Sequence, residues 1–222
     1  MKTVVSTKTV LPNLRNRLEV SGLRVLDYDF ISISLTNFNY TYTNAISIFT
    51  SINAVKSVLL NSEIDQIRKN KCCCVGKNTQ AFLEANDFEV LLCSDYATNL
   101  TEDLKPLINN NNFVFFSGNL RRNTIPDFFK AQQKPLNEIQ TYTTALTPIE
   151  IKENIDAVLF FSPSAVESFF SKNKITNKPL FCIGSTTAEK ALEYSKNTIV
   201  AHQTSQLEVV KSVENYFLTL EN

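Results

Sequence analysis

The fold is decided by the stretch Phe181-Cys182-Ile183-Gly184-Ser185-Thr186-Thr187-Ala188. Apolar residues, a glycine and a run of hydroxyl residues lead straight into residues 189–192, which favour helix. This pattern predicts a parallel strand that turns into a helix. Backbone N–H groups in the first turn of a helix have no intrahelical partner, so hydroxyls beside them suit an anionic or carbonyl oxygen. A helix cap without any ligand is the alternative interpretation.

The same pattern occurs twice in the chain. The frame S-x-x-A-V-x-S stands at residues 51–57 and again at residues 162–168. An apolar strand that ends in G-x-x-T follows each copy at nearly the same spacing, at Gly76 and at Gly184. Two motifs repeated in the same order predict two related α/β units, each a parallel sheet with helices on both faces.

Glycine is scarce in this chain, and its positions are informative. Three of the four glycines, Gly76, Gly118 and Gly184, lie where a predicted strand turns into a helix, and Gly22 closes a helix. Ligands of open α/β sheets bind at the carboxyl ends of the strands. Two domains whose strand ends face each other would therefore form a cleft lined by hydroxyls and helix N-termini.

Two extended connectors, at residues 31–42 and 138–146, indicate how the domains are joined. A chain that starts in one domain, crosses, builds a second domain and returns accounts for both connectors. The predicted division assigns residues 1–33 and 145–222 to a discontinuous first domain and residues 38–140 to the second. Residues 34–37 and 141–144 are predicted as linker strands.

Composition excludes several classes of function. Lys plus Arg equal Asp plus Glu at 22 each, so no basic surplus favours nucleic acid as a partner. No apolar run is long enough to cross a bilayer, and the first residues do not resemble a targeting segment. We therefore expect a cytoplasmic protein without a membrane partner, and a monomer.

Cysteine and histidine usage argues against metal and nucleophilic chemistry. Three of the five cysteines, Cys72, Cys73 and Cys74, are consecutive on a predicted strand, where neighbouring side chains point to opposite faces and cannot share one metal. We expect them to be buried, reduced side chains. The single histidine, His202, lies in a predicted polar loop, so Ser-His and Cys-His pairs are not supported.

The sequence also contains no motif that is typical of a cofactor site. The G-x-x-T segments have neither the P-loop spacing nor that of G-x-G-x-x-G, so no metal and no cofactor is expected. What remains is a site of amides, hydroxyls and Tyr142, which can hold a polyanion and donate one proton. Such a site suits a substrate that is already reactive.

Six segments together resemble the uroporphyrinogen-III synthase family in content and order. They are FTSINAV (49–55), VGKNT (75–79), FSGNLRR (116–122), TYT (141–143), FSPS (161–164) and IGSTTA (183–188). The resemblance implies two flavodoxin-like α/β domains joined by a two-stranded linker, the first of them discontinuous. It also implies an enzyme that closes hydroxymethylbilane into uroporphyrinogen III, with loss of water and inversion of ring D, without metal or cofactor.

The resemblance also implies residue roles. Tyr142 is the candidate proton donor to the departing hydroxyl, and a packing role at the domain hinge is its alternative. The residues expected to bind the substrate are Thr50, Ser51, Thr79, Ser117, Gly118, Asn119, Ser162, Ser164, Gly184, Thr186 and Thr187. This sequence departs from the family pattern in having Lys8 for a common Arg, Ser185 for Pro, Ala165 for Gly and Asn197 for Gly.

Other classes of two-domain α/β protein predict features that can be looked for in the sequence. A small-molecule binding protein of the periplasmic type, without catalysis, would carry a signal peptide. A glycosyltransferase that uses a nucleotide sugar would show a phosphate-binding loop or an acidic metal motif. Neither feature is visible in the sequence.

Overall fold

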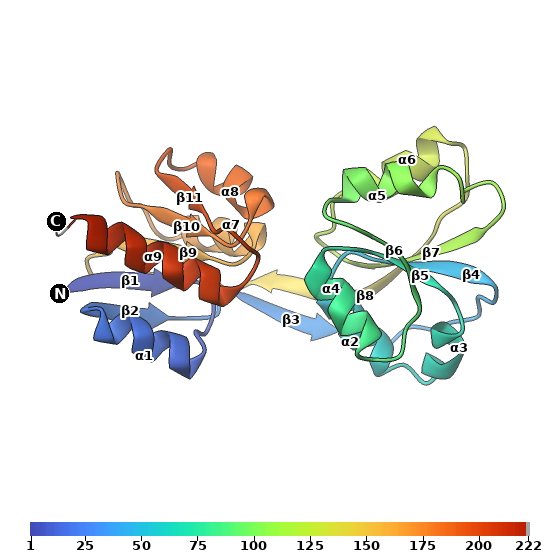
Figure 1. Cartoon of the computed structure of the whole chain (residues 1–222), viewed down its shortest axis with the longest axis horizontal. Helices are drawn as coiled ribbons and strands as arrows, with labels where there is room; N and C mark the ends of the chain where they lie inside the picture. The colour runs from blue at the N-terminus through green and yellow to red at the C-terminus, as the bar shows by residue number, and fades with distance from the viewer. Residues whose placement is uncertain (221–222) are drawn as a thin grey trace. The chain divides into compact units, whose positions relative to one another are not determined.

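The computed structural model describes residues 1–220 and divides the chain into two compact units (Figure 1). Unit 1 contains Met1–Ser32 and the described part of Ala145–Asn222, and unit 2 is Ile33–Thr144. Both units are α/β structures whose sheets are mainly parallel, which confirms the α/β class predicted from the sequence.

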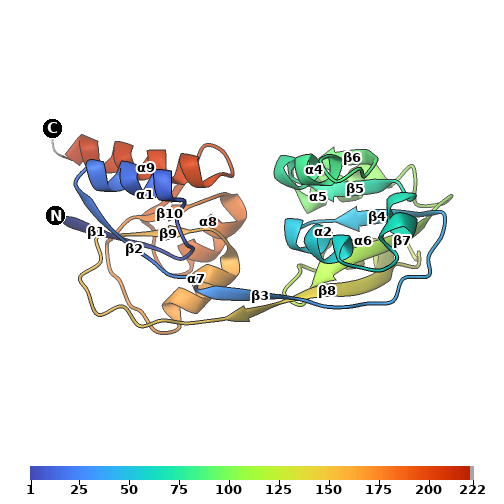
Figure 2. The same cartoon turned by 90° about the horizontal axis from the view of Figure 1, so that it is seen from below.

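Unit 1 has a five-stranded sheet in the order β2-β1-β9-β10-β11, and all neighbouring strands are parallel. Helices α1 and α9 cover one face of this sheet and α7 and α8 the other (Figure 2). Its elements are β1 (Lys2–Ser6), α1 (Pro12–Val20), β2 (Leu23–Asp27), β9 (Ala157–Phe160), α7 (Pro163–Phe170), β10 (Leu180–Cys182), α8 (Ser185–Leu192), β11 (Thr198–Val200) and α9 (Gln206–Leu220).

Unit 2 is built on a six-stranded sheet in the order β3-β8-β7-β4-β5-β6, parallel from β8 to β6. Side chains of α2, α3 and α4 pack on one face and those of α5 and α6 on the other. The elements are β3 (Ile31–Leu35), β4 (Ala45–Phe49), α2 (Ile52–Leu59), α3 (Ile64–Arg68), β5 (Cys72–Val75), α4 (Lys77–Glu84), β6 (Val90–Ser94), α5 (Ala97–Leu104), β7 (Asn112–Gly118), α6 (Thr124–Ala131) and β8 (Asn137–Leu146).

The repeat predicted from the sequence is present in both sheets. One copy is β4-α2-β5-α4-β6 and the other is β9-α7-β10-α8-β11, and in each copy the three strands are neighbours. Two further strands extend each copy on one side: β1 lies beside β9 with β2 at the edge, and β7 lies beside β4 with β8 beyond it. Five strands of each sheet therefore have the same spatial order, although the added pair precedes the repeat in unit 1 and follows it in unit 2, where β3 lies at the edge beside β8.

Several predicted boundaries differ from the structure at the strand ends. Helix α8 begins at Ser185 and α4 at Lys77, so the hydroxyl and amide residues after each glycine form the first helical turn and are not a separate loop. Gly118, predicted to lie where a strand turns into a helix, belongs with Ser117 to β7, because β8 pairs with that strand as far as Gly118. Strands β4 and β5 coincide with the mainly apolar runs at residues 45–49 and 72–75.

The consecutive cysteines alternate between the two faces of the unit 2 sheet. Cys72 and Cys74 pack in the cluster beneath α2, whereas Cys73 packs in the cluster beneath α5. All three are fully buried and unbridged, and burial raises the pKa of the Cys72 and Cys73 thiols to about 12. The prediction of buried thiols that point to opposite faces is confirmed.

The two repeated glycines differ in backbone conformation, which allows a matched test. Gly76 has φ +85° and Gly184 has φ −171°. A side chain is strained only in the left-handed conformation, so Gly76→Ala should lower the free energy of unfolding by about 1 to 2 kcal/mol. Gly184→Ala should lower it clearly less, although its Cβ would lie 3.3 Å from Thr204 Cγ2. Urea unfolding of both variants measures the difference, and equal losses would contradict this account.

Candidate functional site

The carboxyl ends of β9 and β10 bring five predicted residues of unit 1 to one edge of the sheet. Ser162 caps α7, where its Oγ accepts a hydrogen bond from the Ala165 N–H at 3.1 Å. Ser164 Oγ lies 3.1 Å from the same oxygen. Gly184 is the cap residue of α8, and Thr186 and Thr187 follow in its first turn. Because β9 and β10 are parallel neighbours, these two helix starts are adjacent.

The two helix starts of unit 1 differ in how they are capped. Ser162 provides a side-chain acceptor for the first turn of α7, whereas Gly184 provides none for α8. The positive end of the α8 dipole therefore carries no capping side chain from Gly184, which suits an external anion. Thr187 is buried at 3% exposure, while Thr186 is half-buried beside it.

Unit 2 repeats this arrangement at the ends of β4 and β5. Ser51 caps α2, and its Oγ accepts from the Asn53 N–H at 3.1 Å. Thr50 precedes it and is half-buried. Gly76 is the cap residue of α4, and Thr79 is the buried third residue of that helix, as Thr187 is in α8. The structure thus places the repeated motifs in equivalent positions of the two units.

Ser117, at the end of β7, belongs to a polar cluster with Glu138 and Arg121. Its side chain is buried, and its hydroxyl donates to Glu138 Oε1 at 2.8 Å. Arg121 donates to the same carboxylate from Nε at 2.5 Å and from Nη2 at 3.0 Å. The hydrogen bonds from Arg121 and Ser117 hold the pKa of Glu138 below its usual range, against the effect of burial. The Ser117 hydroxyl is therefore already engaged within the protein.

Asn119 joins the end of β7 to β8. Its Oδ1 accepts from the Thr144 N–H at 2.7 Å, and its Nδ2 donates to the Thr144 carbonyl at 3.1 Å. The residue is exposed, but both polar ends of its side chain are used for this clamp. Asn119 therefore holds two neighbouring strands together beside Tyr142.

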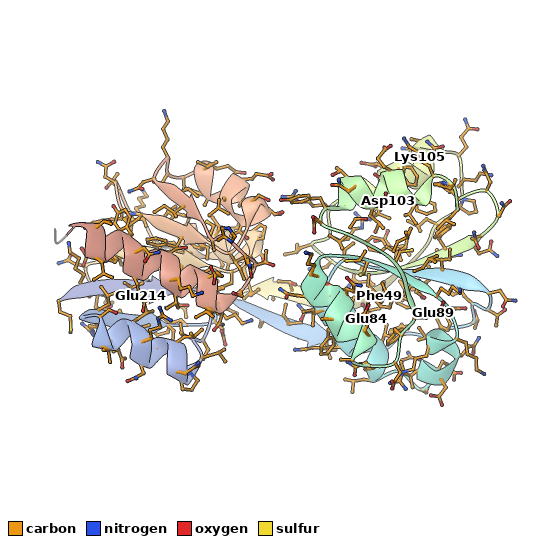
Figure 3. The ribbon with its side chains drawn as sticks, viewed as in Figure 1. Phe49, Glu84, Glu89, Asp103, Lys105 and Glu214 are labelled. Carbon is orange, nitrogen blue, oxygen red and sulfur yellow. The ribbon has the colours of Figure 1, made fainter. Side chains whose placement is uncertain are left out.

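Gly118 and Tyr142 are brought into direct contact. They are register partners on β7 and β8, and a Cβ atom on Gly118 would overlap Cε2 and Cζ of the Tyr142 ring. The ring therefore lies over the backbone of Gly118. It also packs against the cluster that contains Phe49 and Phe116, whose rings stack with centroids 4.9 Å apart (Figure 3 labels Phe49). No side chain or backbone group within residues 1–220 forms a hydrogen bond with the Tyr142 hydroxyl. This hydroxyl is therefore available to a ligand.

Sequence reasoning missed the side chains that support this part of the site. Glu138, Arg121, Thr141 and Thr144 contact the predicted residues, although the sequence analysis assigns them no role. Arg121 carried a signal, because a positive charge follows Ser117 and Gly118 closely at a strand end, whereas Glu138, 17 positions further on, carried none. Thr141 and Thr144 carried none, because their roles depend on pairing with a distant strand.

Two further properties of the described part of the chain bear on the chemistry. No group of three or more His, Cys, Asp or Glu residues in the described range could hold a metal ion. None of the helices within residues 1–220 has the length and apolar character needed to cross a membrane.

Comparison with known proteins decides the family. The sequence model of the family described as uroporphyrinogen-III synthase HemD matches residues 15–210, which span both units. The chain belongs to this family. The uroporphyrinogen-III synthases are cyclising lyases of heme biosynthesis, so the family and the enzyme class predicted from the sequence are confirmed. A search of curated proteins found no match.

Solved structures agree with the assignment to the uroporphyrinogen-III synthases at the level of the fold. The uroporphyrinogen-III synthetase from Helicobacter pylori 26695 is 16% identical with a TM-score of 0.73, covering 97% of this chain and 100% of that one. A triple mutant of the uroporphyrinogen III synthase from the extreme thermophile Thermus thermophilus is 13% identical with a TM-score of 0.68, covering 99% and 100%. At such low identity the likeness establishes the architecture.

From the contacts of Glu138 we predict a stability that depends on pH. Because the folded pKa of Glu138 is depressed, its bonds stabilise the fold above the ordinary glutamate pKa, and this contribution is lost as the pH falls through the folded pKa. Glu138→Gln should lower the free energy of unfolding by up to about 1 kcal/mol at neutral pH. The difference from wild type should shrink toward about pH 2 in urea titrations.

A matched control for Glu138→Gln comes from an exposed ion pair. Glu102 bonds to Lys105 one helical turn away, and both side chains are more than half exposed. Glu102→Gln should change the free energy of unfolding little at any pH. An equal effect of the two substitutions would show that the Glu138 cluster contributes no more than an ordinary surface pair.

Proposed function

We propose that this chain closes hydroxymethylbilane to uroporphyrinogen III, with loss of water and inversion of ring D. The observation that carries the proposal is the family match, which runs through both units. The helix starts at the strand ends support it, since the acetate and propionate groups of the bilane are anions that such amides and hydroxyls bind. The substrate is thus a polycarboxylate held without a metal.

The proposed substrate contacts follow the repeated motifs of both units. The first turns of α2, α4, α7 and α8 supply backbone amides, and side-chain hydroxyls flank them. In this proposal the hydroxyl residues contact the substrate, while Ser117, Gly118 and Asn119 shape the strand end beside Tyr142. The contacting set is Thr50, Ser51, Thr79, Ser162, Ser164, Gly184, Thr186 and Thr187.

In the proposed reaction Tyr142 is the acid for the departing hydroxyl. The phenol donates its proton to that hydroxyl, the carbon–oxygen bond breaks and water leaves, with the electron pair of the terminal pyrrole assisting. Closure with inversion forms two carbon–carbon bonds to ring D and breaks the one that joined this ring to the bilane, and ring D releases one proton, which restores the phenol. The availability of the Tyr142 hydroxyl and the position of Tyr142 on β8, beside the end of β7, support this role.

The proposal includes two flavodoxin-like lobes joined by a linker. Counted along the chain, the strands of unit 1 have the order 2-1-3-4-5, as in flavodoxin. Five strands of unit 2 have the same order when β7 is counted as the first strand, β8 as the second, and β4, β5 and β6 as the third to fifth. Strands β3 and β8, which carry the chain between the units, are hydrogen-bonded neighbours and would form the linker. A monomer in the cytoplasm is the proposed working form, and this part rests on the sequence.

The decisive assay supplies freshly made hydroxymethylbilane to the purified chain and separates the product isomers. We expect isomer III to dominate, because the proposed reaction closes the ring with inversion of ring D. Isomer I forms spontaneously and is the product expected without enzyme. If isomer I alone forms, at the uncatalysed rate, the chain does not catalyse ring closure and can at most bind hydroxymethylbilane.

Removal of the Tyr142 hydroxyl tests its role as acid. Tyr142→Phe keeps the ring that packs against the aromatic cluster, so the fold should persist by circular dichroism. The rate of ring closure should fall by about one to two powers of ten if the phenol is the single general acid. Turnover at the wild-type rate would leave Tyr142 only a packing role.

A further inference from the structure

We propose that a β-bulge at Thr141 aims Tyr142, with Thr141 and Gly118 as positioning residues for this tyrosine. The inference rests on the proposed function for the catalytic importance of Tyr142, but its structural part stands on β7 and β8 alone. It concerns which face of the sheet receives the phenol ring and what keeps it there.

The faces of β8 show that the strand is not regular at this point. Side chains three residues apart on a regular strand point to opposite faces. Ile139 and Tyr142 are three apart, yet both pack against the cluster that contains Phe49 and Phe116. One residue between them must therefore be extra.

The register with β7 identifies the extra residue. Ser117 pairs with Gln140, and the next residue, Gly118, pairs with Tyr142. Thr141 is thus the additional residue of a bulge, and such a residue re-aims the side chains that follow it. Without it, Tyr142 would point to the opposite face of the sheet.

Hydrogen bonds hold the bulge on both sides of Tyr142. Thr141 is fully buried, and its hydroxyl donates to the Ser117 carbonyl at 3.2 Å. After Tyr142, the Asn119 clamp binds the N–H and the carbonyl of Thr144. The Asn119 N–H also donates to the Tyr142 carbonyl at 3.3 Å. The backbone around Tyr142 is therefore tied to β7 before, at and after the tyrosine.

Gly118 provides the space into which the ring is aimed. A Cβ at this position would lie 2.8 Å from the hydroxyl oxygen of Tyr142 and closer still to Cε2 and Cζ of the ring. Gly118 does not have a positive φ, so its backbone conformation does not require glycine. A glycine is needed there because the Tyr142 ring occupies the space of a side chain. Any larger residue would displace the phenol.

Placement of this kind matters for an acid catalyst. The proton donor must reach the leaving oxygen within hydrogen-bond distance, and a misplacement of about 1 Å costs on the order of a hundredfold in rate. The opposite face of β7 and β8 near this point holds the Ser117, Glu138 and Arg121 cluster. A slipped register would thus move the phenol away from its face.

The first test compares Thr141→Val with Thr141→Ser. Valine keeps the branched shape but loses the bond to the Ser117 carbonyl, whereas serine keeps a hydroxyl. We expect Thr141→Val to lower kcat for hydroxymethylbilane about tenfold, with KM nearly unchanged, and Thr141→Ser to stay within about threefold of wild type. Equal losses in both variants, or a change in KM alone, would overturn the inference.

The second test reads the ring itself. The chain has seven tyrosines and no tryptophan, so fluorotyrosine labelling gives a simple ¹⁹F NMR spectrum. The Tyr142 resonance is the one lost in Tyr142→Phe. It should shift or broaden in Thr141→Val and in Gly118→Ala, but not in Thr141→Ser. An unchanged resonance in Thr141→Val contradicts the proposal even if Gly118→Ala does not fold.

A double variant separates this inference from the proposed function. If Thr141 acts through the Tyr142 hydroxyl, Thr141→Val should slow the Tyr142→Phe enzyme no further. An additive loss would assign Thr141 a role independent of the tyrosine and overturn the inference. A wild-type chain that makes no isomer III would overturn the proposed function instead, and the ¹⁹F resonance would still decide whether the bulge places the ring.

Discussion

Both units depend on parallel pairing between strands that helices bury on two sides. Parallel neighbours bring all their carboxyl ends to one edge of the sheet, so residues far apart in the chain meet there. Ser51 follows β4 and Gly118 ends the neighbouring strand β7, although the two residues lie 67 positions apart. Within each unit, the amides and hydroxyls proposed to contact the substrate meet at the carboxyl ends of neighbouring strands because of this parallel pairing.

Five strands of each sheet have the same spatial order, but the chain connects them in a different sequence in the two units. Unit 1 places its added strands, β1 and β2, before the repeated segment, and unit 2 places β7 and β8 after it. The layers follow the same correspondence, since α1 and α9 share a face as α6 and α5 do. By this correspondence β8, which carries Tyr142, is the counterpart of β2, and the Thr141 bulge is a local addition to a shared plan.

Local pattern was sufficient to predict elements whose signal lies within a few residues. Strands β4 and β5 coincide with mainly apolar runs at residues 45–49 and 72–75, and the serines that cap α2 and α7, Ser51 and Ser162, are the first residues of the repeated motif. The Thr141 bulge could not be predicted, because it exists only in register with Ser117 and Gly118, more than twenty positions away. For the same reason, the engagement of Ser117 with Glu138 was invisible in the sequence.

The division of the chain also sets an order of assembly. Unit 2 is one continuous segment, Ile33–Thr144, whereas β1 of unit 1 must wait for β9, as the bond from the Thr3 N–H to Asp156 Oδ2 across 153 positions illustrates. Closing so long a loop costs little more entropy once the intervening segment has become compact. During synthesis on the ribosome, unit 2 can therefore fold first. Its folding brings β1 and β2 close to β9, the strand beside which β1 later pairs.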